Sequence, residues 1–329
     1  MNKCIYTISV LLIISTTLTA VDFEKYAGEF MSLGAGSRAM GMAGAYTAVA
    51  NDVTAGYWNP AGLTDAKPAE ILFMHSKQFI SSIQYNYLTA SSRMKDGSTI
   101  GISFLYLTIN GIPDSREAYD EIAGRTDYSR VRRFNTGDYT LFLTYANSYT
   151  DKLSYGVNVK LIGRDYEVES ALGLGFDIGL KYKLYNNLTV GAMLRDVTSS
   201  IMTWSTGRKE LITPSIRTGI SYLLHWDKFN LAFQPAVDFN ILFENREYAA
   251  QFNAGPVSVD ALAGLEVAYK NTLALRAGYD DLNRFNTGIG ITIPKITFDY
   301  SFTAGQSDLG DIQRISFHLA FDRTVFDRK

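Results

Sequence analysis

Apolar and polar residues alternate one by one along most of the chain after about residue 69. In residues 171–183, ALGLGFDIGLKYK, apolar side chains occupy every second position, with glycine, aspartate or lysine between them. A period of two predicts a β-strand whose two faces meet different surroundings. No long helical period separates the segments, which excludes a fold built from β-α-β units. Fourteen strands, most of them about 9–12 residues long, are predicted to begin near residues 70, 83, 98, 137, 152, 171, 187, 214, 228, 259, 272, 284, 295 and 312.

The connections between these segments alternate in length. Short, turn-like connections are predicted after the even-numbered segments, at residues 95–97, 148–151, 185–187, 225–227, 270–271 and 294–295. Longer loops are predicted after most odd-numbered segments, at residues 108–136, 164–170, 196–213, 240–258 and 304–311. Short turns at one rim and long loops at the other are typical of an outer-membrane barrel. The connections near residues 79–82 and 280–284 are shorter than this scheme predicts.

The two faces of the predicted strands favour a membrane barrel over a soluble β-sandwich. One face is apolar and nearly free of charge, as lipid contact requires, because a charge there costs about 2–4 kcal/mol at the bilayer midplane. The other face carries Gly, Ala, Asn and Ser with scattered charges of both signs, whereas the wet face of a soluble strand is usually rich in Lys, Glu and Thr. The charges predicted to face the lumen are Lys160, Asp177, Arg195, Arg217, Asp238, Arg276 and Asp299.

Aromatic residues cluster near the predicted short turns, where an interfacial girdle of Tyr and Trp is expected. The high β-propensity of Tyr is an alternative explanation for their positions. The predicted fold is an all-β membrane protein, a 14-stranded antiparallel transmembrane β-barrel over residues 69–321, because closure removes the unpaired edges that a bilayer does not tolerate. The girdle residues are Tyr145, Tyr149, Tyr182, Tyr185, Tyr222, Trp226 and Tyr269.

The first 20 residues are predicted to be a cleaved signal peptide. Lys3 precedes an apolar run that ends in small residues, and the run is shorter than the roughly 20 residues of a spanning helix. The only cysteine, Cys4, lies within it, so no disulfide is expected in the mature chain. The last strand is expected to end at Phe321, with a charged tail at 322–329. The expected location is the bacterial outer membrane, with both termini on the periplasmic side.

Residues 21–68 do not alternate and are predicted to form a small hatch, or plug, inside the barrel. The segment is rich in Gly and Ala, which suits close approach of backbones, and an Asn-Pro pair ends any helix. The alternative is an unstructured periplasmic leader, although such leaders usually carry fewer apolar and aromatic residues. Arg38 and Asp52 are candidates to pair with charges of the wall. The candidate hatch or gate residues are Gly36, Arg38, Gly41, Gly44, Asp52, Asn59, Pro60, Ala61 and Gly62.

Charge and motifs offer little for catalysis. The formal net charge of −2 and the absence of a basic stripe argue against nucleic-acid binding. His75, His225 and His318 have no close ligand spacing, so neither a metal nor another cofactor is expected. A Ser-His-Asp triad is recognised by geometry and not by sequence, but the expectation is a protein that is not an enzyme. The charged run at 113–133 is either a solvated loop with a short helix or a loop that docks a partner.

The N-terminal segment SLGAGSRAMGMAGAYTAVANDVTAGYWNPAGL, residues 32–63, closely resembles the N-terminal signature of the PorV/PorQ family, a branch of the FadL-like outer-membrane proteins. Asn59-Pro60-Ala61 matches the family's NPA motif, and the segments that begin at Gly175 and Thr203 are similar to its mid-barrel segments. The resemblance covers most of the mature chain. It implies a fourteen-stranded barrel with an N-terminal hatch inside it.

Two functions follow from this resemblance. PorV-like members serve type IX protein secretion, so the favoured expectation is a component of protein secretion or surface assembly that contacts outer-membrane lipids, secreted proteins or secretion-system subunits. The alternative is a FadL-like channel for hydrophobic small molecules such as fatty acids or hydrocarbons. A channel predicts apolar residues in the lumen, with Phe142, Leu223 and Leu262 as candidates, and a wall gap such as one at Pro235. A purely structural barrel is the third possibility.

Overall fold

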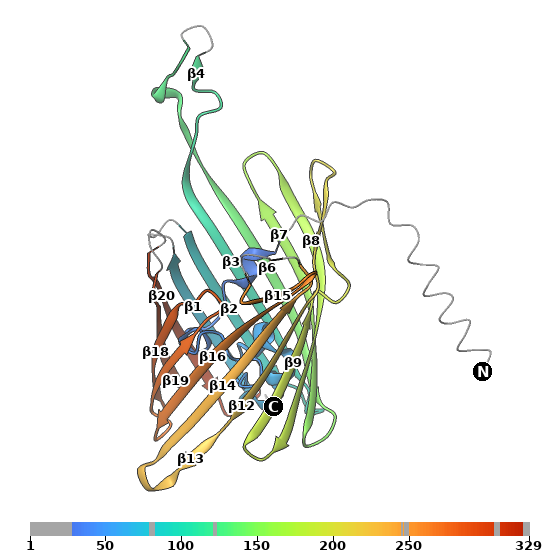
Figure 1. Cartoon of the computed structure of the whole chain (residues 1–329), viewed down its shortest axis with the longest axis vertical. Coiled ribbons are helices and arrows are strands. Elements are labelled where there is room, and N and C mark those ends of the chain that lie inside the picture. The colour runs from blue at the N-terminus through green and yellow to red at the C-terminus, as the bar shows by residue number, and fades with distance from the viewer. Residues whose placement is uncertain are drawn as a thin grey trace, which may run out of the picture.

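The structure is a computed structural model that describes residues 28–78, 83–120, 124–244, 246, 250–305 and 310–324. The predicted signal peptide, residues 21–27 of the predicted hatch and the end of the predicted tail lie outside these residues. Within them the chain forms one large antiparallel sheet, with four short helical turns before the first strand (Figure 1). Among the described residues, no helix is both long enough and apolar enough to cross a membrane.

The sheet is a closed barrel of fourteen antiparallel strands, as the alternation predicted. Each strand pairs with the next along the chain, and β1 pairs with β20 from Ala69 opposite Phe321 to Lys77 opposite Gln313, which closes the ring. The strands of the ring are β1 (Ala69–Gln78), β2 (Ile83–Arg93), β3 (Thr99–Asp114), β6 (Arg132–Ser148), β7 (Leu153–Asp165), β8 (Ser170–Tyr185), β9 (Leu188–Arg195), β12 (Ser215–Tyr222), β14 (Leu231–Leu242), β16 (Val257–Tyr269), β17 (Leu273–Tyr279), β18 (Phe285–Ile293), β19 (Ile296–Thr303) and β20 (Ile312–Phe321).

Shorter elements lie before and between these strands. The N-terminal segment, defined here as residues 28–68, contains η2 (Glu29–Ser32), α2 (Ser37–Gly41), α3 (Ala55–Trp58) and η3 (Pro60–Asp65). The connections contain β4 (Tyr119–Asp120), β5 (Arg125–Thr126), η4 (Tyr128–Arg130), β10 (Ser200–Trp204), β11 (Lys209–Ile212), β13 (Leu224–Trp226), η5 (Asp227–Phe229) and β15 (Phe252–Ala254).

Several predicted loops are shorter than expected because the strands continue into them. β3 and β6 stay paired as far as Asp114 opposite Arg132 and rise above the other strands, so much of the predicted loop at 108–136 is strand (Figure 1). β7 and β8 stay paired to Asp165 opposite Ser170, which leaves only a tight turn of the predicted loop at 164–170. Backbone hydrogen bonds continue a strand after its side chains cease to alternate between apolar and polar.

The outward faces of the strands are apolar. In β8 the alternate residues from Leu172 to Tyr182 are all exposed, while Gly175, Asp177 and Lys181 are buried on the inner side. All seven predicted girdle aromatics are exposed. Pro235 lies exposed within β14 and opposite Leu265 of β16, so the strand passes through this proline without the expected gap.

The hydrophobic core lies within the ring, between the N-terminal segment and the wall. Tyr57 of α3 packs edge-on against Trp58, Tyr87 of β2 and Phe142 of β6, with ring centroids 4.9, 6.2 and 6.2 Å apart. These four aromatic residues belong to one buried cluster that joins the segment to the wall. The barrel is therefore packed across its lumen by its own N-terminal segment (Figure 1).

Candidate functional site in the barrel lumen

The N-terminal segment folds as a chain of tight turns because its small residues allow conformations that larger ones resist. Gly34, Gly36 and Gly44 have positive φ values of 87°, 81° and 75°, which favour glycine. A side chain at Gly62 would put its Cβ 2.3 Å from the carbonyl oxygen of Ala50, so two turns of the segment touch there. The positive φ values and the close approach of the turns explain why the segment is so rich in glycine and alanine.

Glycines of the wall lie where the segment passes. A Cβ built at Gly156, Gly179 or Gly191 would stand 2.4, 2.3 and 2.4 Å from atoms of Pro60, Asn59 and Thr47, respectively. A Cβ built at Gly264 or Gly278 would likewise stand 2.5 or 2.6 Å from backbone atoms of Met42. One built at Gly41 of the segment would stand 3.1 Å from the Cα of Gly288. The glycines that the alternation placed on the polar face thus form a surface on which the backbone of the segment lies.

Asp238 of β14 binds the middle of the segment. Its Oδ2 accepts hydrogen bonds from the backbone N–H groups of Tyr46 and Thr47 at 3.0 and 2.9 Å, and from the Thr47 hydroxyl at 2.6 Å. Arg217 of β12 lies 3.2 Å from the same oxygen and donates to the Gly44 carbonyl at 2.7 Å. Its guanidinium also lies 4.8 Å from the Trp58 ring centroid. A buried ion pair of the wall therefore holds backbone atoms of the segment.

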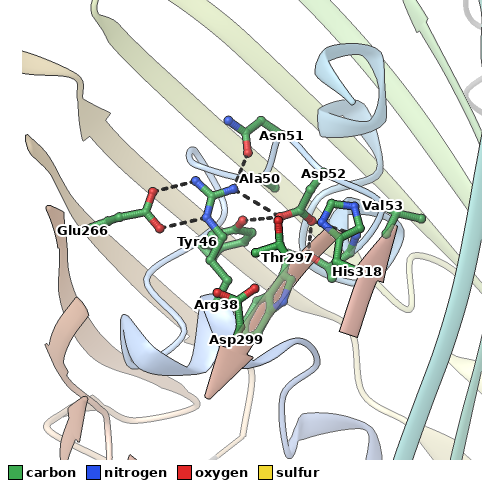
Figure 2. A network of polar contacts seen from close by, with 12 residues as sticks. Arg38, Tyr46, Ala50, Asn51, Asp52, Val53, Glu266, Thr297, Asp299 and His318 are labelled. Carbon is green, nitrogen blue, oxygen red and sulfur yellow. Dashed lines mark hydrogen bonds and ion pairs between the residues drawn. The ribbon is translucent and has the colours of Figure 1, made fainter. Parts of the chain in front are cut away.

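Arg38 of α2 links the segment to β16, the strand of the wall that pairs with β14 (Figure 2). Its guanidinium donates to both carboxylate oxygens of Glu266 of β16, at 2.9 and 2.8 Å, and lies 3.2 Å from Asp52. Glu266 also pairs with Arg276 of β17 at 2.6 Å, and Arg276 pairs with Asp299 of β19 at 2.6 Å. A two-pronged arginine–carboxylate contact of this kind fixes orientation as well as charge.

Asp52 is held from several sides within the segment. It accepts from Tyr46 Oη at 2.6 Å and from the Thr54 N–H at 2.8 Å, in addition to its contact with Arg38. Burial by itself would raise the pKa of Asp52, but the charge of Arg38, followed by that of His318, outweighs burial and lowers this pKa below its usual value. Asp52 therefore stays ionised in the lumen.

Glu70, at the start of β1, ties the end of the segment to the closing strands. Its carboxylate accepts from the N–H groups of Val53 and Lys67 at 2.6 and 2.8 Å. His318 of β20 lies 3.3 Å from the same carboxylate. His75 contacts Asn86 at 2.8 Å, and His225 is exposed. Among the described residues, no group of three or more His, Cys, Asp or Glu side chains is arranged to hold a metal ion.

The Asn-Pro-Ala-Gly stretch at 59–62 forms the turn into η3. Asn59 donates to the carbonyl oxygens of Thr47 at 2.9 Å and of Leu180 in β8 at 3.0 Å. Its own side-chain oxygen accepts from the Ala61 N–H at 3.2 Å, and Pro60 occupies the first position of the helical turn. The asparagine therefore caps the turn, crosses to the wall and binds the loop that carries Thr47.

The predicted lumen charges come together as pairs, with one exception. Besides the Arg217–Asp238 and Arg276–Asp299 pairs, Lys160 of β7 lies 2.7 Å from Asp177 of β8 and 2.6 Å from Asp196. Arg195 instead lies over the Tyr57 ring, 5.6 Å from its centroid, and its buried Nη2 has no hydrogen-bond partner among the described residues. The candidate set omitted Glu266, Asp196 and Arg314, although Glu266 and Arg314 alternate with apolar residues and so carried the same signal as the residues that were chosen.

A cavity of about 480 Å³ lies between the segment and the wall. The segment contributes Leu33, Met40 and Trp58, and the wall contributes Leu262 of β16 and Ile312 of β20. Other lining residues, among them Ser215, Leu242, Asp280 and Arg284, lie where strands meet the rim of longer connections, here called the long-loop rim. The cavity therefore lies on the long-loop side of the segment.

Comparison with solved structures finds proteins of similar architecture, two of them toluene transporters. The Ralstonia pickettii toluene transporter TbuX matches 88% of this chain and 98% of its own, with 13% identity and a TM-score of 0.56. The Pseudomonas putida toluene transporter TodX matches 87% and 96%, with 13% identity and a TM-score of 0.55. A Pseudomonas aeruginosa FadL homologue matches 87% and 98%, with 11% identity and a TM-score of 0.52.

The chain shares the FadL-like fold. At these identities the likeness establishes the closed fourteen-stranded barrel and no more. No protein-family model matches the sequence, and no curated protein matches it. The resemblance to PorV/PorQ thus receives no support at the level of that family.

Adding a methyl group to the wall at Gly191 should loosen the segment. In Gly191→Ala the new Cβ would stand 2.4 Å from the Thr47 carbonyl, so we expect destabilisation of about 1–3 kcal/mol through overpacking. The reporter is a Val49→Cys thiol, buried in the segment, whose modification by a polar maleimide measures opening. Gly137→Ala is the control, because its Cβ would meet only Tyr106 and Tyr139 side chains of the wall. Equal labelling rates in both variants would count against the close contact.

Removing the charge of Arg38 should release the segment from β16. The side chains of Arg38 and Glu266 are 22% and 9% exposed, so the pair is partly buried. Losing one partner of such a hydrogen-bonded charge pair costs about 2 kcal/mol, so Arg38→Met should speed the labelling of the same Val49→Cys thiol about thirtyfold. Arg116→Gln is the control, since it removes an ion pair whose arginine side chain is 53% exposed and should have little effect. A rate for Arg38→Met within twofold of the parent would contradict the anchoring role.

Acid should abolish the contribution of Asp52. Because the folded-state pKa of Asp52 is lowered, its stabilisation is complete above its usual pKa of about 4 and is lost as pH falls through the folded value. We expect amide exchange across residues 37–58, corrected for intrinsic rates, to be faster in Asp52→Asn than in the parent at neutral pH. This difference should shrink as pH falls below about 4, and a difference independent of pH would exclude this ionisation as its source.

Proposed function

We propose that the chain is a non-enzymatic outer-membrane barrel that admits small hydrophobic molecules, with residues 21–68 acting as its hatch. The observation that carries the proposal is the cavity of about 480 Å³ between the segment and the wall, in which Leu33, Met40, Trp58 and Leu262 share the lining with charged residues of the wall and rim. Concave, largely apolar sites with a few polar groups are the usual form of small-molecule sites. The fold shared with the toluene transporters TbuX and TodX supports the same class of cargo.

The exposed apolar face of the strands and the exposed aromatics near the short turns support the placement in a membrane. In outer-membrane barrels the longer loops lie outside the cell and the short turns face the periplasm. The N-terminal segment enters β1 at Ala69 and β20 ends at Phe321, opposite each other at the short-turn rim. We therefore place both termini on the periplasmic side and the cavity toward the exterior.

Passage toward the periplasm requires the segment to move. The Asn59–Gly62 turn lies against Gly156 and Gly179, and Lys181 and Lys183 pair with Asp65 just beyond it, at 3.0 and 2.7 Å. The segment thus separates the cavity from the short-turn rim. Its attachment through discrete ion pairs, including Arg38–Glu266, gives it a definite closed position. These contacts are the ones that a gate has to break.

Two of the three apolar lumen candidates have places consistent with this role. Leu262 lines the cavity, and Phe142 packs against Tyr57 in the buried cluster of the lumen without lining the cavity. Leu223 lies between β12 and β13, is only half-buried and does not line the cavity. The secretion role expected from the PorV/PorQ resemblance has no comparable support, because no protein-family model and no curated protein matches the sequence.

Filling the cavity should block transport. Leu262→Trp places a large ring in the cavity, and we expect uptake of radiolabelled toluene by cells that express the protein to fall about tenfold. Leu265→Trp is the matched control, three residues along β16 and on its exposed outer face. The cells lack other channels for this compound, and an empty-vector strain sets the background.

Uptake at background in the parent, or equal uptake by both variants, would contradict the proposal. Native purification provides an independent check. Stoichiometric co-elution of exported proteins or of large secretion subunits would favour the secretion role instead. A barrel that co-elutes with a bound apolar compound would support the channel.

A further inference from the structure

The outward face of the barrel carries a polar patch at the seam where the barrel closes. In β1 the alternate residues Leu72, Met74 and Ser76 are buried inside, so the residues between them point outward. Residues that lie opposite each other on paired strands project to the same side of the sheet. The polar residues that share this outward face on β1, β2 and β20 are here called the outer seam patch: His75, Lys77, Gln84, Asn86 and Gln313.

The outer seam patch is arranged in two rows across the three strands. Lys77 lies opposite Gln313 on one side and opposite Gln84 on the other, so one cation stands between two amides. In the next row His75 lies opposite Asn86, and His75 Nδ1 is 2.8 Å from Asn86 Oδ1. The second row thus contains its own hydrogen bond. Lys77, by contrast, forms no salt bridge with any described residue.

The patch is unlike the rest of the described outward face. On the other strands of the ring, outside the β3–β6 extension beyond Ile109, the outward positions hold apolar or aromatic residues, Gly, Ser or Thr. The two exceptions, Asn147 and Asp165, lie at or next to a strand end. A lysine on the lipid-facing surface is destabilising at the bilayer midplane and is tolerated toward the interfaces. The patch therefore calls for a polar neighbour outside the barrel.

The apolar belt of the barrel is low at this place. Along β1, His75 is six and Lys77 eight residues from Ala69 at the short-turn rim. At about 3.3 Å per residue and a tilt of about 40°, the two lie roughly 15 and 20 Å above that rim, within an apolar band about 25 Å tall. The outward apolar residues of β1 end at Phe73, whereas those of β8 continue to Leu172. A lysine this near the outer edge can extend its ammonium group to the interface.

The charge of the patch favours an anionic head group as its neighbour. An ammonium group flanked by two amides offers donors side by side to the oxygens of a phosphate. A second copy of this chain fits less well, because a two-fold contact would bring Lys77 against Lys77 and the patch contains no carboxylate. Four residues, 79–82, connect β1 and β2, whereas β3 and β6 beside them rise above the other strands (Figure 1).

We propose that the outer seam patch binds the phosphorylated head group of an outer-leaflet glycolipid of the lipid A type. The Lys77 ammonium pairs with a phosphate, and the amides of Gln84 and Gln313 donate to further oxygens of the same group. The acyl chains lie against Phe73 and Ile315, of which Ile315 is 59% exposed. The proposal depends on the placement of the barrel in the outer membrane. It depends neither on the channel nor on the movement of the hatch.

The test measures binding of bisphosphorylated lipid A to the purified full-length protein in neutral detergent, by titration and native mass spectrometry. Lys77→Gln removes the charge and keeps an amide donor. Lys95→Gln is the matched control, because Lys95 is an exposed lysine of the turn between β2 and β3 at the opposite rim. We expect Lys77→Gln to weaken lipid A binding about tenfold and Lys95→Gln to leave it unchanged. Added salt should weaken binding to the parent more than to Lys77→Gln.

A second variant keeps the lysine and tests the amides. The double variant Gln84→Leu/Gln313→Leu makes the neighbours of Lys77 apolar, and it serves if Lys77→Gln does not fold. Folding is judged by the heat-dependent migration of the barrel in detergent gels. A face that contacts only hydrocarbon should accept both leucines without loss of lipid affinity. We expect a folded barrel that binds lipid A several-fold more weakly, because the amide hydrogen bonds to phosphate are lost.

The outcomes separate the glycolipid from other neighbours. Equal lipid A affinity in the parent and in Lys77→Gln, or equal binding of dephosphorylated lipid A, overturns the proposal. Inorganic phosphate that displaces lipid A at equal concentration shows a free-anion site instead, and phosphatidylglycerol that binds as tightly as lipid A shows a general site for anionic lipids. A dimer that dissociates in Lys77→Gln shows a protein contact. Each of these results overturns the glycolipid site, and the toluene uptake assay tests the channel separately.

Discussion

The pairing of β1 with β20 is the constraint on which the rest of the structure depends. It joins strands at opposite ends of the barrel sequence, from Ala69 opposite Phe321 to Lys77 opposite Gln313. Closure removes the two open edges of the sheet and divides every strand into an outward and an inward face. The outward face is apolar and the inward face holds the charges. Closure also places His318 of β20 beside Glu70 near the start of β1, and Arg314 opposite Ser76 further along the same pair of strands.

Inside the ring, close backbone contacts and ion pairs together hold the N-terminal segment against the wall. The segment lies so close to Gly156, Gly179 and Gly191 that little side-chain volume fits between it and the wall. Apolar packing is therefore limited at these points, and hydrogen bonds and ion pairs of the wall, such as those of Asp238, fix the position instead. Such pairs are poor sources of net stability but specify one arrangement well.

The fourteen strands were predictable because lipid and lumen impose a period of two that nothing else in the chain imitates. The ends of β3 and β6 were not, since above the apolar zone the ladder from Ile109 to Asp114 continues without alternating side chains. Inward charges such as Arg276 could be identified from the alternating pattern. The ion pairs between the segment and the wall could not, because a pair such as Arg38–Glu266 joins residues 228 positions apart in the sequence. The short signature at 32–63 indicated a hatch and a secretion family, and the fold likeness reaches only the broader FadL-like architecture.

The segment and the cavity cannot be treated as separate features. Met40 lines the cavity, and Arg38, two residues earlier in the same short helix, holds Glu266. A ligand that displaces Met40 therefore acts on α2, a helix of five residues in which the Arg38 side chain is paired with Glu266 of the wall. The Arg38–Asp52–Tyr46 contacts carry that displacement to the next turn of the segment, and Asn59 joins the Thr47 loop to β8. On the proposed channel function, these packed, hydrogen-bonded residues are the route by which occupancy of the cavity would bias the position of the segment, provided that the ligand binds one position more tightly than the other.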